Sequence, residues 1–148
     1  MTDDYQKGEF YLIRGDWEAA LREFKPLAEQ GYADAQTNLG YMYRLGLGVV
    51  KDYKTAVKWY TLAAKQGYLD AQFNLGLMYR KGEGVVQDNV YAHMWYNIAA
   101  SSGDKVSSRN RESLEKEMTP AEISAAQKLA RECVRKNIRV VESNSQTT

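Results

Sequence analysis

The sequence predicts an all-α protein, an α-α superhelix (solenoid) of helix-turn-helix repeats with C-terminal capping helices. Residues 35–70 and 71–106 align without a gap and are identical at 19 of 36 positions, which indicates an internal repeat. Small and apolar residues recur within each copy at helical spacing. Residues that favour helix ends stand on either side of these runs. Each repeat is therefore predicted to contain two helices.

A diverged first copy of the repeat is predicted over residues 5–34. Phe24 of this copy matches Tyr60 of the next one, and Gly8 matches Gly40 if the first copy has a shorter loop between its two helices. A chain of 148 residues is long enough for one domain with a modest core. We therefore expect three stacked repeat units within a single domain over residues 1–137.

The ends of the repeat helices are predicted from capping residues. Gly46 or Gly48 is positioned to end the first helix in the left-handed conformation, which glycine enters freely. Gly40 lies inside that helix, where glycine costs about 1 kcal/mol relative to alanine, so a close helix contact is the expected compensation. Asp52 and Asp88 stand where the N-cap of the second helix belongs, because an aspartate side chain accepts hydrogen bonds from the first turn.

A tryptophan recurs in the second helix of the two closely matching repeats. Trp59 and Trp95 each precede a tyrosine in the stripe of small and aromatic residues that faces other helices. Both tryptophans are expected to be largely buried between adjacent helices.

The C-terminal part of the chain is predicted to cap the last repeat. A helix of alternating charges is expected over roughly 105–117. A long helix then follows, because Thr119 and Glu122 have the spacing of a capping box. These capping helices are predicted to cover residues 107–137. The polar residues 138–148 show no periodicity and are predicted to form a disordered tail.

Composition excludes several function classes. The chain has 20 Lys and Arg against 19 Asp and Glu, so its net charge of +1 produces no field that attracts nucleic acid. No segment approaches the ~18 apolar residues of a membrane span. Cys133 is the only cysteine, so no internal disulfide forms and no redox compartment is indicated. We expect a soluble chain, cytoplasmic as it stands, or periplasmic or secreted if a signal peptide precedes it.

Few residues of the sequence suggest chemistry. His93 is the only histidine, which excludes a histidine-based zinc cluster, and its alignment with Val57 favours a half-buried helix position over a catalytic base. The glycine pairs that begin at Gly46 and Gly82 follow helices and lack the lysine of a phosphate-binding loop, so we interpret them as turns. No catalytic residue, cofactor or metal is predicted.

The repeats carry a specific sequence pattern. The two close copies read A-Q-x-N-L-G-x-M-Y-R-x-G-x-G-V-V-x-D, followed by A-x-x-W-Y-x-x-A-A-x-x-G. This pattern resembles the Sel-one-like repeat, a relative of the tetratricopeptide repeat. The segment that follows Met118 is also similar to the closing segment of short bacterial members of that family. In the first unit Glu23 replaces the tryptophan and the G-x-G-V loop is absent. The resemblance implies an α-solenoid that binds other proteins.

Tetratricopeptide relatives line a concave groove with residues of the first helix of each repeat. Carried over from the matched glycines, the groove would contain Thr37, Tyr41, Arg44, Phe73, Leu77 and Arg80, and the first unit would add Tyr5, Glu9 and Leu12. A monomer gains nothing from exposing several large apolar side chains in a row, and the flanking arginines suggest a partner with acidic character. The alternative is that these side chains pack against a neighbouring helix or the C-terminal cap.

The predicted function is a protein-protein interaction module or adaptor that binds a peptide or protein segment, with the chain a monomer or weak homo-oligomer. A different class is an assembly subunit, in which the groove or the last helix contacts another copy of the chain. A remote alternative is β-lactam binding or weak hydrolysis, which has been described for certain cysteine-rich secreted members of the family. This chain departs from those members, because Cys133 is its only cysteine and lies outside the repeats. The S-x-x-K pattern occurs at Ser102 and Ser113, but the companion S-D-N and K-T-G motifs are absent. We therefore predict that the chain is not an enzyme.

Overall fold

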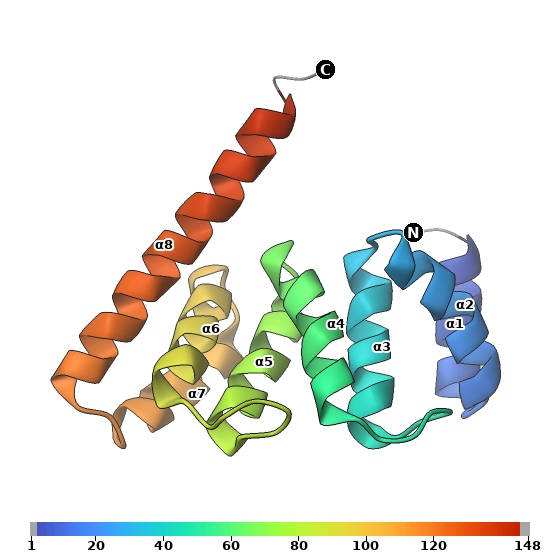
Figure 1. The fold of residues 1–148 in the computed structure, drawn as a ribbon, viewed down its shortest axis with the longest axis horizontal. Coiled ribbons are helices and arrows are strands. Elements are labelled where there is room, and N and C mark those ends of the chain that lie inside the picture. The colour runs from blue at the N-terminus through green and yellow to red at the C-terminus, as the bar shows by residue number, and fades with distance from the viewer. Residues whose placement is uncertain (1–2, 146–148) are drawn as a thin grey trace. The chain divides into compact units, whose positions relative to one another are not determined.

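The computed structural model describes residues 3–145, with side chains described through Lys136. This described part contains no β-strand, which confirms the predicted all-α class. Its helices are α1 (Asp3–Ile13), α2 (Trp17–Glu29), α3 (Ala33–Leu45), α4 (Tyr53–Lys65), α5 (Leu69–Lys81), α6 (Asn89–Ser101), α7 (Lys105–Glu115) and α8 (Pro120–Ser145) (Figure 1).

The chain divides into two compact units. The first consists of residues 1–71 together with the short segment 83–85, and the second consists of residues 72–82 and 86–148. Helix α5 belongs to the second unit from Gln72 onward. Each unit is described by itself, and the prediction of a single domain over residues 1–137 stays a prediction.

Glycines allow close helix contacts in the first unit. Helix α1 packs against α2, α2 against α3, and α3 against α4. A Cβ atom on Gly8 would lie 2.5 Å from the Phe24 ring, and one on Gly40 would lie 2.8 Å from the Tyr60 ring. Only a residue without a side chain allows an aromatic ring this near the helix backbone. The predicted close contact at Gly40 is confirmed, and the equivalent contact in α1 and α2 supports their interpretation as a diverged first repeat.

The predicted helix caps are confirmed. Asp52 Oδ1 accepts hydrogen bonds from the backbone amides of Lys54 and Thr55, at 3.1 and 3.2 Å. Asp88 caps α6 through the equivalent two amides. Gly46 ends α3 with a φ of 71°, a left-handed conformation in which a side chain would be strained. Local sequence therefore determines where these helices begin and end.

The C-terminal helices complete the core of the second unit. Helix α6 packs against both α7 and α8. The buried core residues of this cluster are Ala92, Tyr96, Leu114, Met118 and Ala126. Gly76 of α5 repeats the glycine contact, because a Cβ atom there would lie 2.5 Å from the Tyr96 ring. The second unit thus buries its apolar face with α7 and α8, as capping helices do.

Helix α8 begins with the predicted capping box. The Thr119 amide donates to Glu122 Oε1 at 3.1 Å, and the Glu122 amide donates to Thr119 Oγ1 at 3.2 Å. The helix continues to Ser145, beyond the predicted end at Asn137. No glycine or proline follows Asn137 to stop it, and each further residue adds one backbone hydrogen bond. Of the predicted disordered tail 138–148, only residues 146–148 lie outside the described part.

The two repeat tryptophans differ in burial. Trp95 is 6% exposed, which confirms the predicted buried position. Trp59 is only partly buried and packs at the edge of the first unit's core. The Lys58 ammonium lies 5.4 Å from the centroid of its ring. Trp59 is therefore less buried than predicted, because it packs only at the edge of the core, where solvent and the Lys58 side chain reach its ring.

Candidate functional site

Three of the groove residues that the sequence predicts, Thr37, Tyr41 and Arg44, lie on α3 of the first compact unit, and only Tyr41 is exposed. Thr37 is buried, and its hydroxyl donates to the Ala33 carbonyl at 2.8 Å. Arg44 is half-buried. Tyr41 is 39% exposed, a high value for a large aromatic side chain in the middle of a helix. Of these three side chains, Tyr41 is thus the exposed one.

Arg44 lies beside the hydroxyl of Tyr60. Tyr60 is completely buried; burial raises the pKa of its hydroxyl to about 12, and the Arg44 guanidinium opposes that rise. Within the described residues, neither the Tyr60 hydroxyl nor Arg44 Nε has a hydrogen bond of standard geometry. In the next repeat Arg80 likewise opposes the raised pKa of the buried Tyr96, for which burial is the largest cause. Both arginines therefore act within their own repeat, which weakens the argument for an acidic partner.

Tyr60→Phe tests the state of this hydroxyl. Because the hydroxyl has no hydrogen bond of standard geometry and only the Arg44 guanidinium lies beside it, its removal should change the free energy of unfolding at neutral pH by less than about 1 kcal/mol. The folded-state pKa is raised, so its contribution to stability is present below pH 10 and lost as pH rises through about 12. In Tyr60→Phe, the free energy of unfolding should therefore decrease less as the pH rises over this range, and urea unfolding at several pH values measures this. The control is Tyr41→Phe, and equal alkaline sensitivity of wild type and Tyr60→Phe would contradict the assignment.

The predicted groove residues of α5 pack against the rest of the second compact unit. The Phe73 and Tyr96 rings lie 6.0 Å apart between centroids. Phe73 and Leu77 both contact the cluster that contains Leu114 and Met118, which α7 and the segment after it contribute. Arg80 forms an ion pair with Glu117, at 3.4 Å. The alternative of packing against the C-terminal cap therefore describes these residues, and the expectation that they are exposed was wrong.

Tyrosines and carboxylates of α1 and α3 lie close together in the first unit, and Tyr41 is on the same side of α3 as Asp34 and Asn38. Asn38 Nδ2 of α3 donates to the Tyr5 hydroxyl of α1 at 3.1 Å. Glu9 lies one helical turn after Tyr5, and Asp34 lies one turn before Asn38, so both carboxylates flank this hydrogen bond. We call this surface the tyrosine–carboxylate face and define it by Tyr5, Glu9, Asp34, Asn38, Tyr41 and Tyr68. Tyr5 itself is 5% exposed, so the expectation that it lines a groove was wrong.

The carboxylates of this face act together on Tyr68. Burial is the largest cause that raises the pKa of the half-buried Tyr68, and the charges of Asp70, Asp34 and Glu9 raise it further. Three carboxylates from α1, α3 and the start of α5 therefore lie within electrostatic reach of one hydroxyl. The sequence offered only a weak signal for this group, because the four-residue spacing within α1 and α3 does not reveal that the helices are neighbours.

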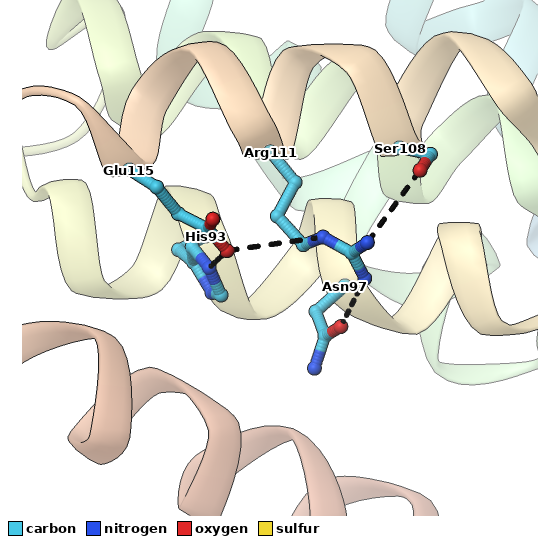
Figure 2. Close-up of polar contacts among 5 residues, drawn as sticks. All are labelled: His93, Asn97, Ser108, Arg111 and Glu115. Carbon is cyan, nitrogen blue, oxygen red and sulfur yellow. Dashed lines mark hydrogen bonds and ion pairs between the residues drawn. The ribbon is translucent and has the colours of Figure 1, made fainter.

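A polar cluster links α6 to α7 in the second unit (Figure 2). His93 Nε2 lies 2.9 Å from Glu115 Oε1, and Arg111 Nη1 donates to Asn97 Oδ1 at 2.7 Å. The same Glu115 oxygen lies 4.0 Å from Arg111 Nε. His93 is fully buried rather than half-buried as the sequence predicted, because Glu115 supplies a partner for its ring. A buried imidazole is closed to substrate, so the cluster is interpreted as structural.

Comparisons with known proteins agree with the repeat geometry. The family model described as "Sel1 repeat" matches residues 33–68 and 69–104. A protective antigen of uropathogenic Escherichia coli, described as displaying an SLR fold, is similar over 97% of this chain, at 30% identity and a TM-score of 0.86. This chain is a Sel1-like repeat protein. A Sel1 repeat protein from Oxalobacter formigenes is similar over 76% of it, at 35% identity and a TM-score of 0.73.

The Sel1-like chain is shorter than these two relatives, since it spans 32% of the first and 46% of the second. The search of curated proteins found no significant match. Its fold is an all-α solenoid, and helices α1 and α2 precede the residues that the Sel1 model matches. Sel1 repeats generally act as protein-interaction modules on a scaffold that is generally non-catalytic.

The serines of the two S-x-x-K patterns do not lie in an assembled catalytic site. Ser102 is an exposed residue at the C-cap of α6, and Ser113 is exposed on α7. In the part of the chain that the structure describes, no three His, Cys, Asp or Glu side chains are placed to hold a metal ion. None of the described helices has the length and apolar character needed to cross a bilayer.

Proposed function

We propose that this Sel1-like repeat protein is an interaction module that binds a peptide or an extended protein segment on the tyrosine–carboxylate face. The exposure of Tyr41 carries the proposal, since 39% of its side chain meets solvent although it lies in the middle of α3. Tyrosine is enriched among the residues that dominate binding energy at protein interfaces. Asn38 and Asp34 lie on the same side of α3 and supply polar groups that orient a bound backbone.

Other large apolar side chains are more exposed than Tyr41. Val50 and Val86 are 89% and 88% exposed, and Ile13 is 85% exposed. Val50 and Val86 lie in loops and Ile13 ends α1, and single exposed apolar residues are common on protein surfaces. Binding sites combine an apolar contact with a few placed polar groups. The surroundings of Tyr41 meet this requirement.

The proposed site is smaller than the groove that the sequence predicts. Phe73 and Leu77 contribute to the core of the second unit, so their replacement would lower stability as well as any affinity. Thr37 is buried. We therefore assign the direct contact to Tyr41 and the polar contacts to its neighbours on α1 and α3.

The proposal is tested with a displayed library of random 12-residue peptides selected on the intact chain. Tyr41→Ala should weaken binding of the selected peptides about thirtyfold, the effect of a hot spot worth about 2 kcal/mol. Its melting temperature should stay close to that of the wild type, because Tyr41 is exposed. Tyr91→Ala is the matched control, since Tyr91 is 42% exposed on α6.

Two outcomes would oppose the proposal. If no selected peptide depends on Tyr41, the face is not the binding site. If light scattering shows a concentration-dependent oligomer that Tyr41→Ala dissociates, the face joins copies of this chain, which is the assembly-subunit alternative.

A further inference from the structure

The tyrosine–carboxylate face contains negative charge that the first unit itself does not pair. Glu9 and Asp34 are both half-buried, on α1 and α3 respectively. Among the described residues, no lysine or arginine forms an ion pair with either carboxylate. Arg44, the cationic residue of α3 that the sequence placed here, lies beside Tyr60 instead. A half-buried carboxylate without a cation gains more from an incoming positive charge than a fully exposed one does, because it is less well screened by water.

The buried Tyr60 explains why Arg44 does not neutralise these carboxylates. Tyr60 is completely buried, and within the described residues its hydroxyl has no hydrogen bond of standard geometry. The charges of Tyr41 and Asp70 act on this hydroxyl, so it lies near the exposed aromatic ring. Buried polar groups are usually paired, and an unpaired one in a folded protein requires an explanation. The Arg44 guanidinium supplies it, because Arg44 lies against this hydroxyl and lowers its pKa, and so the cation of α3 is held away from the carboxylates.

The aromatic ring and the carboxylates suit the same kind of ligand. The aliphatic stem of lysine or the plane of arginine packs on a tyrosine ring, where the cation is attracted to the ring face. Arginine pairs with a carboxylate through two parallel hydrogen bonds, and lysine pairs through one compact charge. Tyr41 lies two turns from Asp34 on α3, a separation that one long cationic side chain and its neighbour span together.

We propose that the segment bound at the tyrosine–carboxylate face is cationic, with lysine or arginine side chains that pair with Glu9 and Asp34 and pack on Tyr41. This inference rests on the proposed function and names the chemistry of the partner. It replaces the acidic partner suggested by the sequence, because Arg44 and Arg80 lie beside buried tyrosines of their own repeats. A phosphorylated or otherwise acidic segment would be repelled at this face.

The selected 12-residue peptides themselves provide the first readout. Peptides that lose binding to Tyr41→Ala should be enriched in lysine and arginine relative to the starting library. One such peptide, made synthetically with each cationic residue replaced by glutamine, should bind the wild-type chain at least about tenfold more weakly. Affinity for the cationic peptide should also fall as the salt concentration rises, since partly exposed charges are screened.

Charge removal on the protein provides the second readout. The double variant Glu9→Gln, Asp34→Asn keeps side-chain size and hydrogen-bond acceptors, and should weaken the cationic peptide about tenfold. The matched control is Glu18→Gln, Glu29→Gln, which removes two exposed charges of α2 and should change affinity by less than about twofold. If the double variant melts below the wild type, the glutamine-substituted peptide on the wild-type chain decides the question without a mutation.

The two proposals fail in different ways. Enriched peptides that depend on Tyr41 but are neutral or acidic overturn the cationic partner and leave the interaction module in place. Full affinity of the cationic peptide for Glu9→Gln, Asp34→Asn also overturns it. A selection without any Tyr41-dependent peptide overturns the proposed function, and the cationic partner with it.

Discussion

Replacement of Trp95 by alanine is expected to lower the free energy of unfolding by about 3–5 kcal/mol. Trp95 is 6% exposed on α6, so the variant leaves a large cavity beside the other buried residues of that helix. Folded domains are stable by only about 5–15 kcal/mol, so the loss is a large part of the total. Urea unfolding followed by circular dichroism measures it, because the far-ultraviolet signal of an all-α chain is strong.

Trp59→Ala is the matched comparison from the other close repeat. Trp59 is partly buried, with Lys58 over its ring, so its removal exposes less apolar surface and leaves no closed cavity. The expected loss is clearly smaller than at Trp95. Equal losses at the two positions would show that the difference in burial does not control stability here.

A chain that ends at Met118 is expected to lose the cooperative unfolding of the second unit and to aggregate. The truncation removes α8, including Ala126 and Ala130, which are 0% and 4% exposed. It uncovers the cluster around Tyr96 and Leu114, which the intact chain buries completely. Solenoids require a capping element with a polar outer face to stay soluble. Thermal melting and size-exclusion chromatography measure the loss.

A chain that ends at Ile138 is the control for this truncation. It retains all of α8 whose side chains the structure describes, so its melting temperature should stay near that of the intact chain. Similar behaviour of the two truncations, both monomeric with sharp melting transitions, would contradict the role of α8 as a cap.

Much of the secondary structure was predictable because the determining interactions are local. The caps at Asp52, Asp88 and Thr119 depend on hydrogen bonds to amides two or three residues away, which sequence spacing displays directly. The glycine contacts were predictable for a related reason. A glycine within a helix is unfavourable unless something packs against it, and the repeat alignment shows an aromatic residue at a fixed distance along the chain.

The candidate site was predicted less well. Leu77 and Tyr41 occupy equivalent positions in adjacent repeats, yet Leu77 packs against the C-terminal cluster and Tyr41 is exposed. Repeat symmetry assigns both the same exposure, and the symmetry ends where α7 and α8 replace a further repeat. Arg44 and Arg80 were predicted to face an acidic partner, but each lies beside a buried tyrosine. Their positions relative to Tyr60 and Tyr96 depend on how two helices pack.

The sequence by itself determined the helical repeat, the helix ends and the glycine contacts, because periodicity, capping and steric demand act over one repeat length or less. Only the tertiary structure decided which equivalent residues remain exposed, that Arg44 lies against a buried tyrosine, and that Glu9 and Asp34 flank the same hydrogen bond. Those properties depend on side chains from helices distant in sequence. Spacing along the chain does not specify their distances, whereas burial and electrostatic interaction depend directly on them.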